Sequence, residues 1–278
     1  MENNSKIKVV IPTDFSVQAD FAYVMVKNLA KKSDMEVTFL HVLNVPDTVS
    51  LDAEGNIETC GEIDIDYVQK QKDIAEQKLA ALKTEHGNGI NTALVLGRTT
   101  TGIIQYSEEN GYDLIAMGNK GTSGLTERIA GSEAQMIARR SSVPVLTLMC
   151  DRADLELNNV LLVHDFSENG PQNLQLLKLF VKVFDTKLHL LQISDSEQKE
   201  GEIKANMKTF AENNELTEYT THVIEDTDVE SGVTHFNQIH DMDLVCIGTH
   251  GKGGLLHQSA TETLINHLYK PVVSFKIQ

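Results

Sequence analysis

The stretch GYDLIAMGNKGTSG, residues 111–124, decides the fold: a short apolar run ends in closely spaced glycines and leads into a helical pattern. A near copy, DMDLVCIGTHGKGG, stands at residues 241–254. An apolar run of this length, closed by glycines and followed by a helix, is typical of a buried strand in a parallel sheet. The sequence therefore predicts the same strand–loop–helix unit twice.

Two further pairs of segments recur in the same order. KVVIPTDFS at residues 8–16 returns as NVLLVHDFS at 159–167, and VPVLTL at 143–148 returns as KPVVSF at 270–275. A fixed order of several anchors indicates a duplicated unit and not the chance return of one motif. We therefore interpret the chain as a tandem repeat, with domains at residues 1–152 and 153–278.

Each half alternates β-rich apolar runs with amphipathic stretches of helical period. In the first half the expected strands are Ile7–Pro12, Val37–Val45, Thr92–Leu96, Leu114–Gly118 and Val143–Met149. This alternation predicts an α/β fold of two tandem flavodoxin-like (Rossmann-like) domains, each a five-stranded parallel sheet with helices on both faces. The ligand of such a domain sits at the carboxyl ends of the strands, where the strand order reverses.

The first half is longer than the second. Asp14 and Asp165 are 151 residues apart, whereas the glycine loops are 130 apart. The extra residues fall in the acidic segment 44–67, which has little periodicity and reads as a long loop. Long loops are often functional, but surface insertions are also well tolerated. A lid and a plain insertion both remain open.

Composition narrows the class of protein. The 278 residues carry a net charge of -16, divided as -6 in residues 1–152 and -10 in 153–278. Nucleic acids and anionic membranes need a basic face, so neither is an expected partner. Cys60, Cys150 and Cys246 are too few and too far apart for a disulfide framework. With no apolar leader and no 18-residue apolar run, we expect a cytoplasmic protein.

The glycine loop of the first half has the chemistry of a phosphate site. Glycines let a bulky anion approach the backbone N–H groups, and the N-terminus of the next helix adds its positive dipole end. The spacing Gly118-x2-Gly121-x9-Gly131-Ser132 resembles the nucleotide-binding signature of the universal stress protein family. The resemblance extends over both halves of the chain, through the repeated anchors given above.

This resemblance implies a set of site residues in the first domain. Asp14 would lie on the adenosine side of the ligand, the backbone of Val42 would meet adenine, and Gly97 would lie beside the ligand. Gly118, Gly121, Gly131 and Ser132 would line the path of the ribose and phosphates. The implied ligand is ATP or another adenine nucleotide, ADP or AMP, with or without Mg2+.

Two departures from the family pattern bear on this site. Glu133 places a carboxylate directly after Ser132, where it repels a bound phosphate. In the second half Thr261 and Glu262 replace the last glycine and serine, and Thr227 takes the place of Gly97. We therefore expect the first domain to bind nucleotide and the second to be structural.

We expect neither a metal site nor a catalytic residue. His235 and His240, from the His-rich second half, are five residues apart and do not share a helical face. The resemblance implies a stress-response protein acting through nucleotide-dependent association, with Pro144–Leu148 paired internally to Pro271–Phe275 and a homodimer of tandem chains. Two alternatives stay open: a scaffold that binds no nucleotide, and a slow ATPase working at Asp14.

Overall fold

The computed structural model describes residues 6–277 except 88, 120–132, 152, 168–171, 195–198, 251–262 and 266. The elements of the first half are β1 (Ile7–Pro12), α1 (Val17–Leu29), β2 (Met35–Asn44), β3 (Val49–Leu51), β4 (Ile57–Thr59), α2 (Ile65–His86), β5 (Ile90–Gly97), α3 (Thr99–Glu109), β6 (Leu114–Gly118), α4 (Glu133–Arg140) and β7 (Val145–Leu148). Those of the second half are β8 (Asn159–Val163), α5 (Gln175–Phe184), β9 (Lys187–Ser194), α6 (Glu200–Asn213), β10 (Tyr219–Glu225), α7 (Val229–His240), β11 (Leu244–His250) and β12 (Val272–Ile277).

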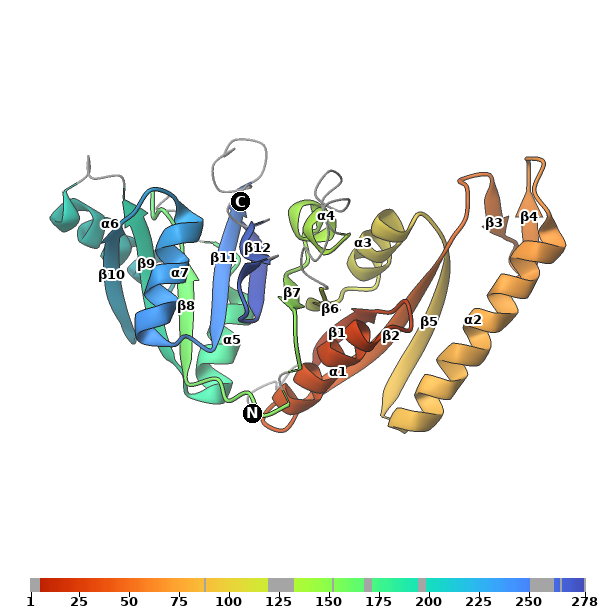
Figure 1. Ribbon diagram of the computed structural model, residues 1–278, viewed down its shortest axis with the longest axis horizontal. Coiled ribbons are helices and arrows are strands. Elements are labelled where there is room, and N and C mark those ends of the chain that lie inside the picture. The colour runs from red at the N-terminus through yellow and green to blue at the C-terminus, as the bar shows by residue number, and fades with distance from the viewer. Residues whose placement is uncertain are drawn as a thin grey trace.

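The main sheet has ten strands in the order β10-β9-β8-β11-β12-β7-β6-β1-β2-β5 and runs through the whole molecule (Figure 1). Within each half all neighbours are parallel, in the order 3-2-1-4-5, which is the Rossmann-like order; flavodoxin-like sheets follow 2-1-3-4-5. The prediction of two five-stranded parallel units covered by helices is confirmed.

The two halves join through an antiparallel pair at the centre of the sheet. Val273 of β12 lies opposite Leu146 of β7, and both side chains are buried. The Thr147 hydroxyl donates to the Val272 carbonyl at 3.3 Å, and the Asn119 amide donates to the Ile265 carbonyl at 3.0 Å. The internal pairing predicted for these two segments is therefore present, and it leaves no open sheet edge at this junction.

Apolar side chains cover both faces of the sheet without a break between the halves. One core cluster joins α1, α2, α5 and α6 to the strands, and the other joins α3, α4 and α7. The strands read as continuous apolar runs because both faces are buried: Val9, Val10 and Ile11 of β1 have no exposed surface. None of the helices in the described part of the chain is both long and apolar enough to cross a bilayer.

Segment 44–67 contains a β-hairpin, β3–β4, where the sequence suggested an irregular loop. The hairpin packs through Val49 and Ile57 on Val45 and Val68, and it extends with the start of α2 beyond one end of the sheet (right in Figure 1). Arg98 ties its base to the end of β5 through two contacts with the Asp47 carboxylate, at 3.0 and 2.8 Å. The insertion is thus an ordered part of the first domain.

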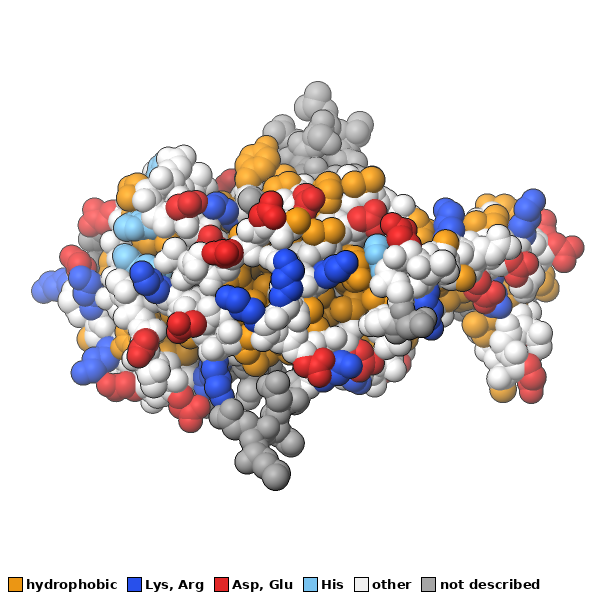
Figure 2. All heavy atoms as spheres, turned by 90° about the horizontal axis from the view of Figure 1, so that it is seen from below, with side chains coloured by type: hydrophobic (Ala, Val, Ile, Leu, Met, Phe, Trp, Pro, Cys, Tyr) orange, Lys and Arg blue, Asp and Glu red, His pale blue; other side chains and the backbone are white. Residues whose placement is uncertain are grey.

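Charged side chains of both signs lie on the face drawn in Figure 2. The described Lys and Arg side chains on this face are interspersed with Asp and Glu.

Candidate functional site

The first predicted site residue, Asp14, lies in a tight turn directly after β1. Its Oδ1 accepts a hydrogen bond from the Ser16 N–H at 3.0 Å, and the Thr13 hydroxyl oxygen accepts one from the Phe15 N–H at 2.9 Å. Phe15 has φ +64, a left-handed conformation that bulky residues rarely adopt. Strained backbone of this kind concentrates at functional sites and persists only where the surroundings enforce it.

Strand β2 continues beyond the end of β1 beside this turn. The Leu40 carbonyl accepts from the Thr13 N–H at 2.8 Å, so the backbone groups of Leu40 point toward β1. Successive strand residues alternate in direction, and the backbone of Val42 therefore points to the same side, above the end of β1. The Val42 side chain is buried. Strand β2 ends two residues after Val42, at Asn44. The main chain of Val42 therefore lies at the same carboxyl end of the sheet as Asp14.

Gly97 and Gly118 are the last residues of β5 and β6. Each position requires a glycine, but for a different reason. Gly97 has φ +148 and open space around it, so backbone conformation is what excludes other residues. At Gly118 a Cβ would lie 1.8 Å from the Gln18 carbonyl oxygen, because the first turn of α1 packs directly on the end of β6. The close approach of α1 therefore requires this glycine whether or not a ligand is bound.

The remaining predicted residues, Gly121, Gly131 and Ser132, lie outside the described part of the chain, as do Thr261 and Glu262 of the second half. The structure brings Asp14, Val42 and Gly118 to neighbouring strand ends around β1 and β6, and places Gly97 at the end of the outer strand β5. The order of the strands reverses between β1 and β6, which is where Rossmann-like domains bind their ligands.

Glu133, the first residue of α4, faces the same region. Burial and next the Asp14 carboxylate raise the pKa of Glu133, while a hydrogen bond with Thr100 of α3 opposes that shift. Two carboxylates thus share the space above β1. They disfavour a further anion at this point unless Glu133 takes up a proton or a cation neutralises the pair.

Three contributors were missed by sequence reasoning: Phe15, Thr100 and Gly102. A Cβ on Gly102 would lie 2.9 Å from Val42 Cγ1, so this glycine lets α3 pack on β2 beside the predicted adenine contact. Gly232 has the same relation to Ile193 in the second half. The recurrence of the DFS motif and of this glycine was visible in the sequence and could have marked Phe15 and Gly102; neither recurrence marks Thr100.

The second half keeps the turn but changes the charge beside it. Asp165 Oδ1 accepts from the Ser167 N–H at 3.0 Å, and Phe166 has φ +52, as in the first half. The difference lies at the start of the third helix of each half. Arg98 directly precedes α3, whereas Asp228 caps α7 by accepting from the Ser231 N–H at 2.9 Å.

A second carboxylate, Asp226, lies close to that helix start. Its Oδ2 is 2.6 Å from Nδ1 of His235, and the hydrogen bond with His235 holds the pKa of Asp226 below its ordinary value. The pKa of Asp228 is lowered as well, chiefly by the Ser231 N–H. Both carboxylates are therefore anionic at neutral pH, and they make this strand end unfavourable for phosphate.

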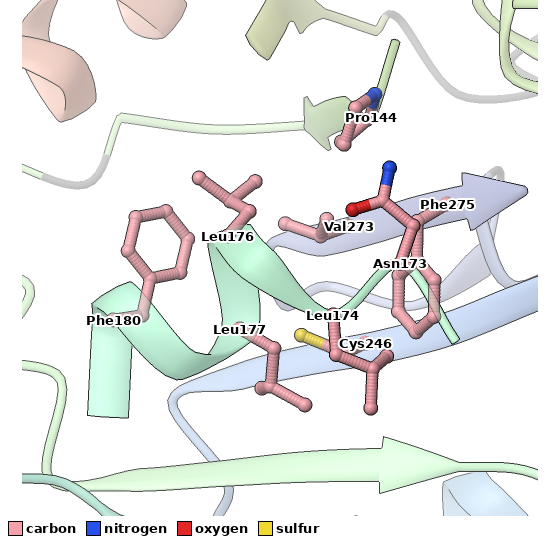
Figure 3. A pocket seen from close by; sticks show the side chains of 9 residues that line it. All are labelled: Pro144, Asn173, Leu174, Leu176, Leu177, Phe180, Cys246, Val273 and Phe275. Carbon is pink, nitrogen blue, oxygen red and sulfur yellow. The ribbon is translucent and has the colours of Figure 1, made fainter. Parts of the chain in front are cut away.

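A pocket beside the junction of the two halves is lined mainly by apolar side chains (Figure 3). It lies between α5, the central strands and the residue before β7, and it is lined by Pro144, Asn173, Leu174, Leu176, Leu177, Phe180, Cys246, Val273 and Phe275. In the first half α1 begins three residues after Asp14, but in the second half α5 begins ten residues after Asp165. Two residues of this longer connection, Asn173 and Leu174, line the pocket. Burial raises the pKa of the Cys246 thiol to about 12, so this thiol is unreactive.

The comparisons with known proteins agree with this architecture. The model of the universal stress protein family matches residues 7–148 and again 156–276. The universal stress protein MJ0531 of Methanocaldococcus jannaschii is 33% identical over 141 residues, which are 51% of this chain and 81% of that protein. MJ0577 of the same organism is 28% identical over 151 residues, covering 51% of this chain and 93% of its own length.

A solved universal stress protein from Archaeoglobus fulgidus matches the chain along nearly its whole length. It covers 97% of this chain and 96% of its own, with a TM-score of 0.73 and 23% identity, so it supports the fold. The class defined by the duplicated α/β sheet is that of tandem Rossmann-like proteins. Within it, the chain belongs to the universal stress protein family.

Proposed function

We propose that the protein is a stress-response protein whose first domain, residues 1–152, binds one adenine nucleotide: ATP, ADP or AMP. The second domain, residues 153–278, keeps the fold and lacks the phosphate site. The observation that carries the proposal is the convergence of Asp14, the Val42 backbone and Gly118 at the strand-order switch of the first sheet.

In this proposal each part of the site has a separate task. The Asp14 carboxylate accepts hydrogen bonds from the nucleoside, and the Val42 backbone meets the base. Gly97 leaves room beside the ligand. The backbone amides of Gly118, Gly121 and Gly131, with the Ser132 hydroxyl, receive ribose and phosphate. Mg2+ would offset the negative charge that Glu133 and Asp14 place near the phosphates.

Signalling would then follow from nucleotide-dependent association. The β7–β12 pair already joins the two domains inside one chain, so a dimer of tandem chains would use another surface. We propose such a homodimer, located in the cytoplasm. Hydrolysis at Asp14 would be at most slow, because the Glu133 carboxylate beside Asp14 repels the phosphates of the nucleotide.

The duplicated turn supplies a matched pair of variants. Asp14→Ala and Asp165→Ala remove the same Asx hydrogen bond to a serine N–H, at 3.0 Å in both halves. Titration calorimetry with ATP, ADP and AMP should show binding at least tenfold weaker in Asp14→Ala and unchanged in Asp165→Ala. Equal effects of the two changes, or no binding to the unaltered protein, would exclude this site.

The scaffold alternative has one observation in its favour. Glu133 lies beside Asp14 where phosphate would bind, and its pKa is raised by burial and by that neighbour. A protein that binds no nucleotide could keep this carboxylate at no functional cost. The same titration separates the two functions, since a scaffold gives no heat with any of the three nucleotides.

A further inference from the structure

Three histidines of the second domain meet on the sheet face that α7 covers. His189 lies in β9, His222 in β10, and His240 is the last residue of α7. Nδ1 of His189 is 3.0 Å from Nε2 of His222, and the two ring centroids are 5.2 Å apart at an interplanar angle of 22°. Phe236 of α7 packs against both His222, at 4.8 Å, and His240, at 4.3 Å.

The first domain has no histidine at the equivalent places. The 151-residue offset aligns His189 with Thr38, and the strand register aligns His222 with Ala93. The 130-residue offset aligns Phe236 with Tyr106, which packs on Tyr112 at 5.7 Å. Burial, and next a hydrogen bond with Tyr112, raise the pKa of Tyr106 to about 12, so the contact that holds α3 does not titrate at neutral or acidic pH.

The geometry of the histidine pair indicates a hydrogen bond between two neutral rings. Nε2 of His189 is buried and has no hydrogen-bond partner. A buried N–H without a partner is rarer than a buried acceptor without one, so we place the His189 proton on Nδ1. His189 then donates to His222 Nε2. A proton added to His222 Nε2 either sets two N–H groups opposite each other or forces the His189 proton onto its buried, unpartnered Nε2, so the bond as it stands is lost.

A metal ion does not fit the same geometry. The distance between the centroids is close to the sum of the hydrogen-bond length and the two ring radii, so the nitrogens point at each other and not at a third position. An ion held in line at about 2.0 Å from each nitrogen would need them roughly 4 Å apart. Nor do any three His, Cys, Asp or Glu side chains of the described residues form a metal site.

Among the described residues, the charged groups that act on the pair are positive when ionised: Lys187 of β9, Lys204 of α6 and His240 of α7. Burial first, and then His189, His240 and Lys204, lower the pKa of His222 from 6.5 to about 4. Burial, His240 and Lys187 lower the pKa of His189 as well. His235 and His267 of the same domain have a different environment, because each is hydrogen-bonded to a carboxylate.

We propose that the His189–His222 pair is an acid-sensitive latch, which holds the C-terminal half of α7 on the β9–β10 edge while both rings are neutral. The pKa of His222 is lower in the folded than in the unfolded chain, so the unfolded chain takes up the proton first as pH falls. The stabilisation is therefore complete above pH 6.5 and is lost as pH falls toward about 4. The first domain has no such response in α3.

Hydrogen exchange of the full chain, corrected for intrinsic rates, tests the latch with α3 as internal reference. Between pH 7.5 and 4.5 the protection of α7 should fall roughly ten- to a hundredfold more than that of α3. In His189→Thr/His222→Ala, which installs the residues of the first domain, α7 and α3 should change equally. The control His267→Gln removes the hydrogen bond to Glu230 at the start of α7 and should keep the excess acid response of that helix.

Two outcomes would overturn the latch: equal acid response of α7 and α3 in the unaltered protein, or the same excess response in the double variant. If the double variant does not fold, the first comparison still decides, since it needs no substitution. The ring protons of His222, followed by NMR in the unaltered protein, should titrate near pH 4; titration near 6.5 would contradict the latch.

Discussion

The two domains share their scaffold and differ at the carboxyl ends of their strands. Both have the strand order 3-2-1-4-5, an Asx turn with a left-handed phenylalanine, and a glycine where the third helix packs on the second strand. Directly before this third helix the first domain has Arg98 and the second has Asp228. The fold thus constrains the strand interiors and turns, while the charge at the strand ends is free to diverge.

Because both domains have this turn, its strained backbone is not by itself a sign of a ligand site. Phe15 and Phe166 both have positive φ, although we propose a ligand for the first domain alone. Phe166 is fully buried and packs edge-on against Phe210 at 5.1 Å, whereas the Phe15 ring lies 4.6 Å from His41 and is partly exposed. The left-handed turn therefore belongs to the scaffold, and the ligand is a second use of it.

The largest expected effect is at the junction that makes one sheet of two domains. Leu146→Asp places a carboxylate opposite Val273 at a position with no exposed surface. We expect a loss of about 4 kcal/mol or more, because a buried charge without a partner is strongly destabilising. Urea unfolding followed by circular dichroism should show separate transitions for the two domains.

The matched control at this position is Leu146→Ile, which conserves volume and should cost about 1 kcal/mol. An unchanged midpoint in Leu146→Asp would mean that the domains do not depend on the β7–β12 pair.

The next effect separates packing from ligand binding at Gly118. Gly118→Ala would set a Cβ 1.8 Å from the Gln18 carbonyl oxygen, so α1 must move. We expect a loss of about 3 kcal/mol in the nucleotide-free protein. Gly89→Ala, at a position with nothing within 4 Å, should be close to neutral in the same urea titration. Equal stability of the two variants would rule out the packing role.

The smallest effect concerns the charge at the proposed phosphate position. Glu133→Gln removes the negative charge beside Asp14 and should tighten ATP binding several-fold, about 1 kcal/mol, with little change for adenosine. Because the pKa of Glu133 is raised, its carboxylate gains a proton earlier than usual as pH falls. ATP binding to the unaltered protein should therefore tighten toward acidic pH, and this dependence should weaken in Glu133→Gln. Calorimetry at two pH values checks both statements.

Much of the fold could be predicted from the sequence because the repeat supplied its own alignment. The strands Ile7–Pro12 and Leu114–Gly118 were predicted with their observed bounds, since buried parallel strands are unbroken apolar runs. The β3–β4 hairpin was missed because each of its strands is only three residues long. Such short strands leave almost no periodic signal.

The site was less accessible from sequence than the fold. Asp14, Val42, Gly97 and Gly118 could be named from spacing and resemblance, but the packing of Gly118 on Gln18 depends on where α1 begins. The left-handed φ of Phe15 and the contact of Glu133 with Thr100 depend on tertiary structure. No periodic pattern encodes contacts between residues so far apart in the chain.

The central claim is that only the first domain binds an adenine nucleotide. Titration calorimetry of the full chain with ATP, ADP and AMP tests it most directly when repeated on Gly131→Glu, a change that places an acidic residue in the first loop, one position before the residue that matches Glu262. We predict one nucleotide per chain in the unaltered protein and none in Gly131→Glu. Two nucleotides per chain, binding that survives Gly131→Glu, or no heat with any of the three would contradict the claim.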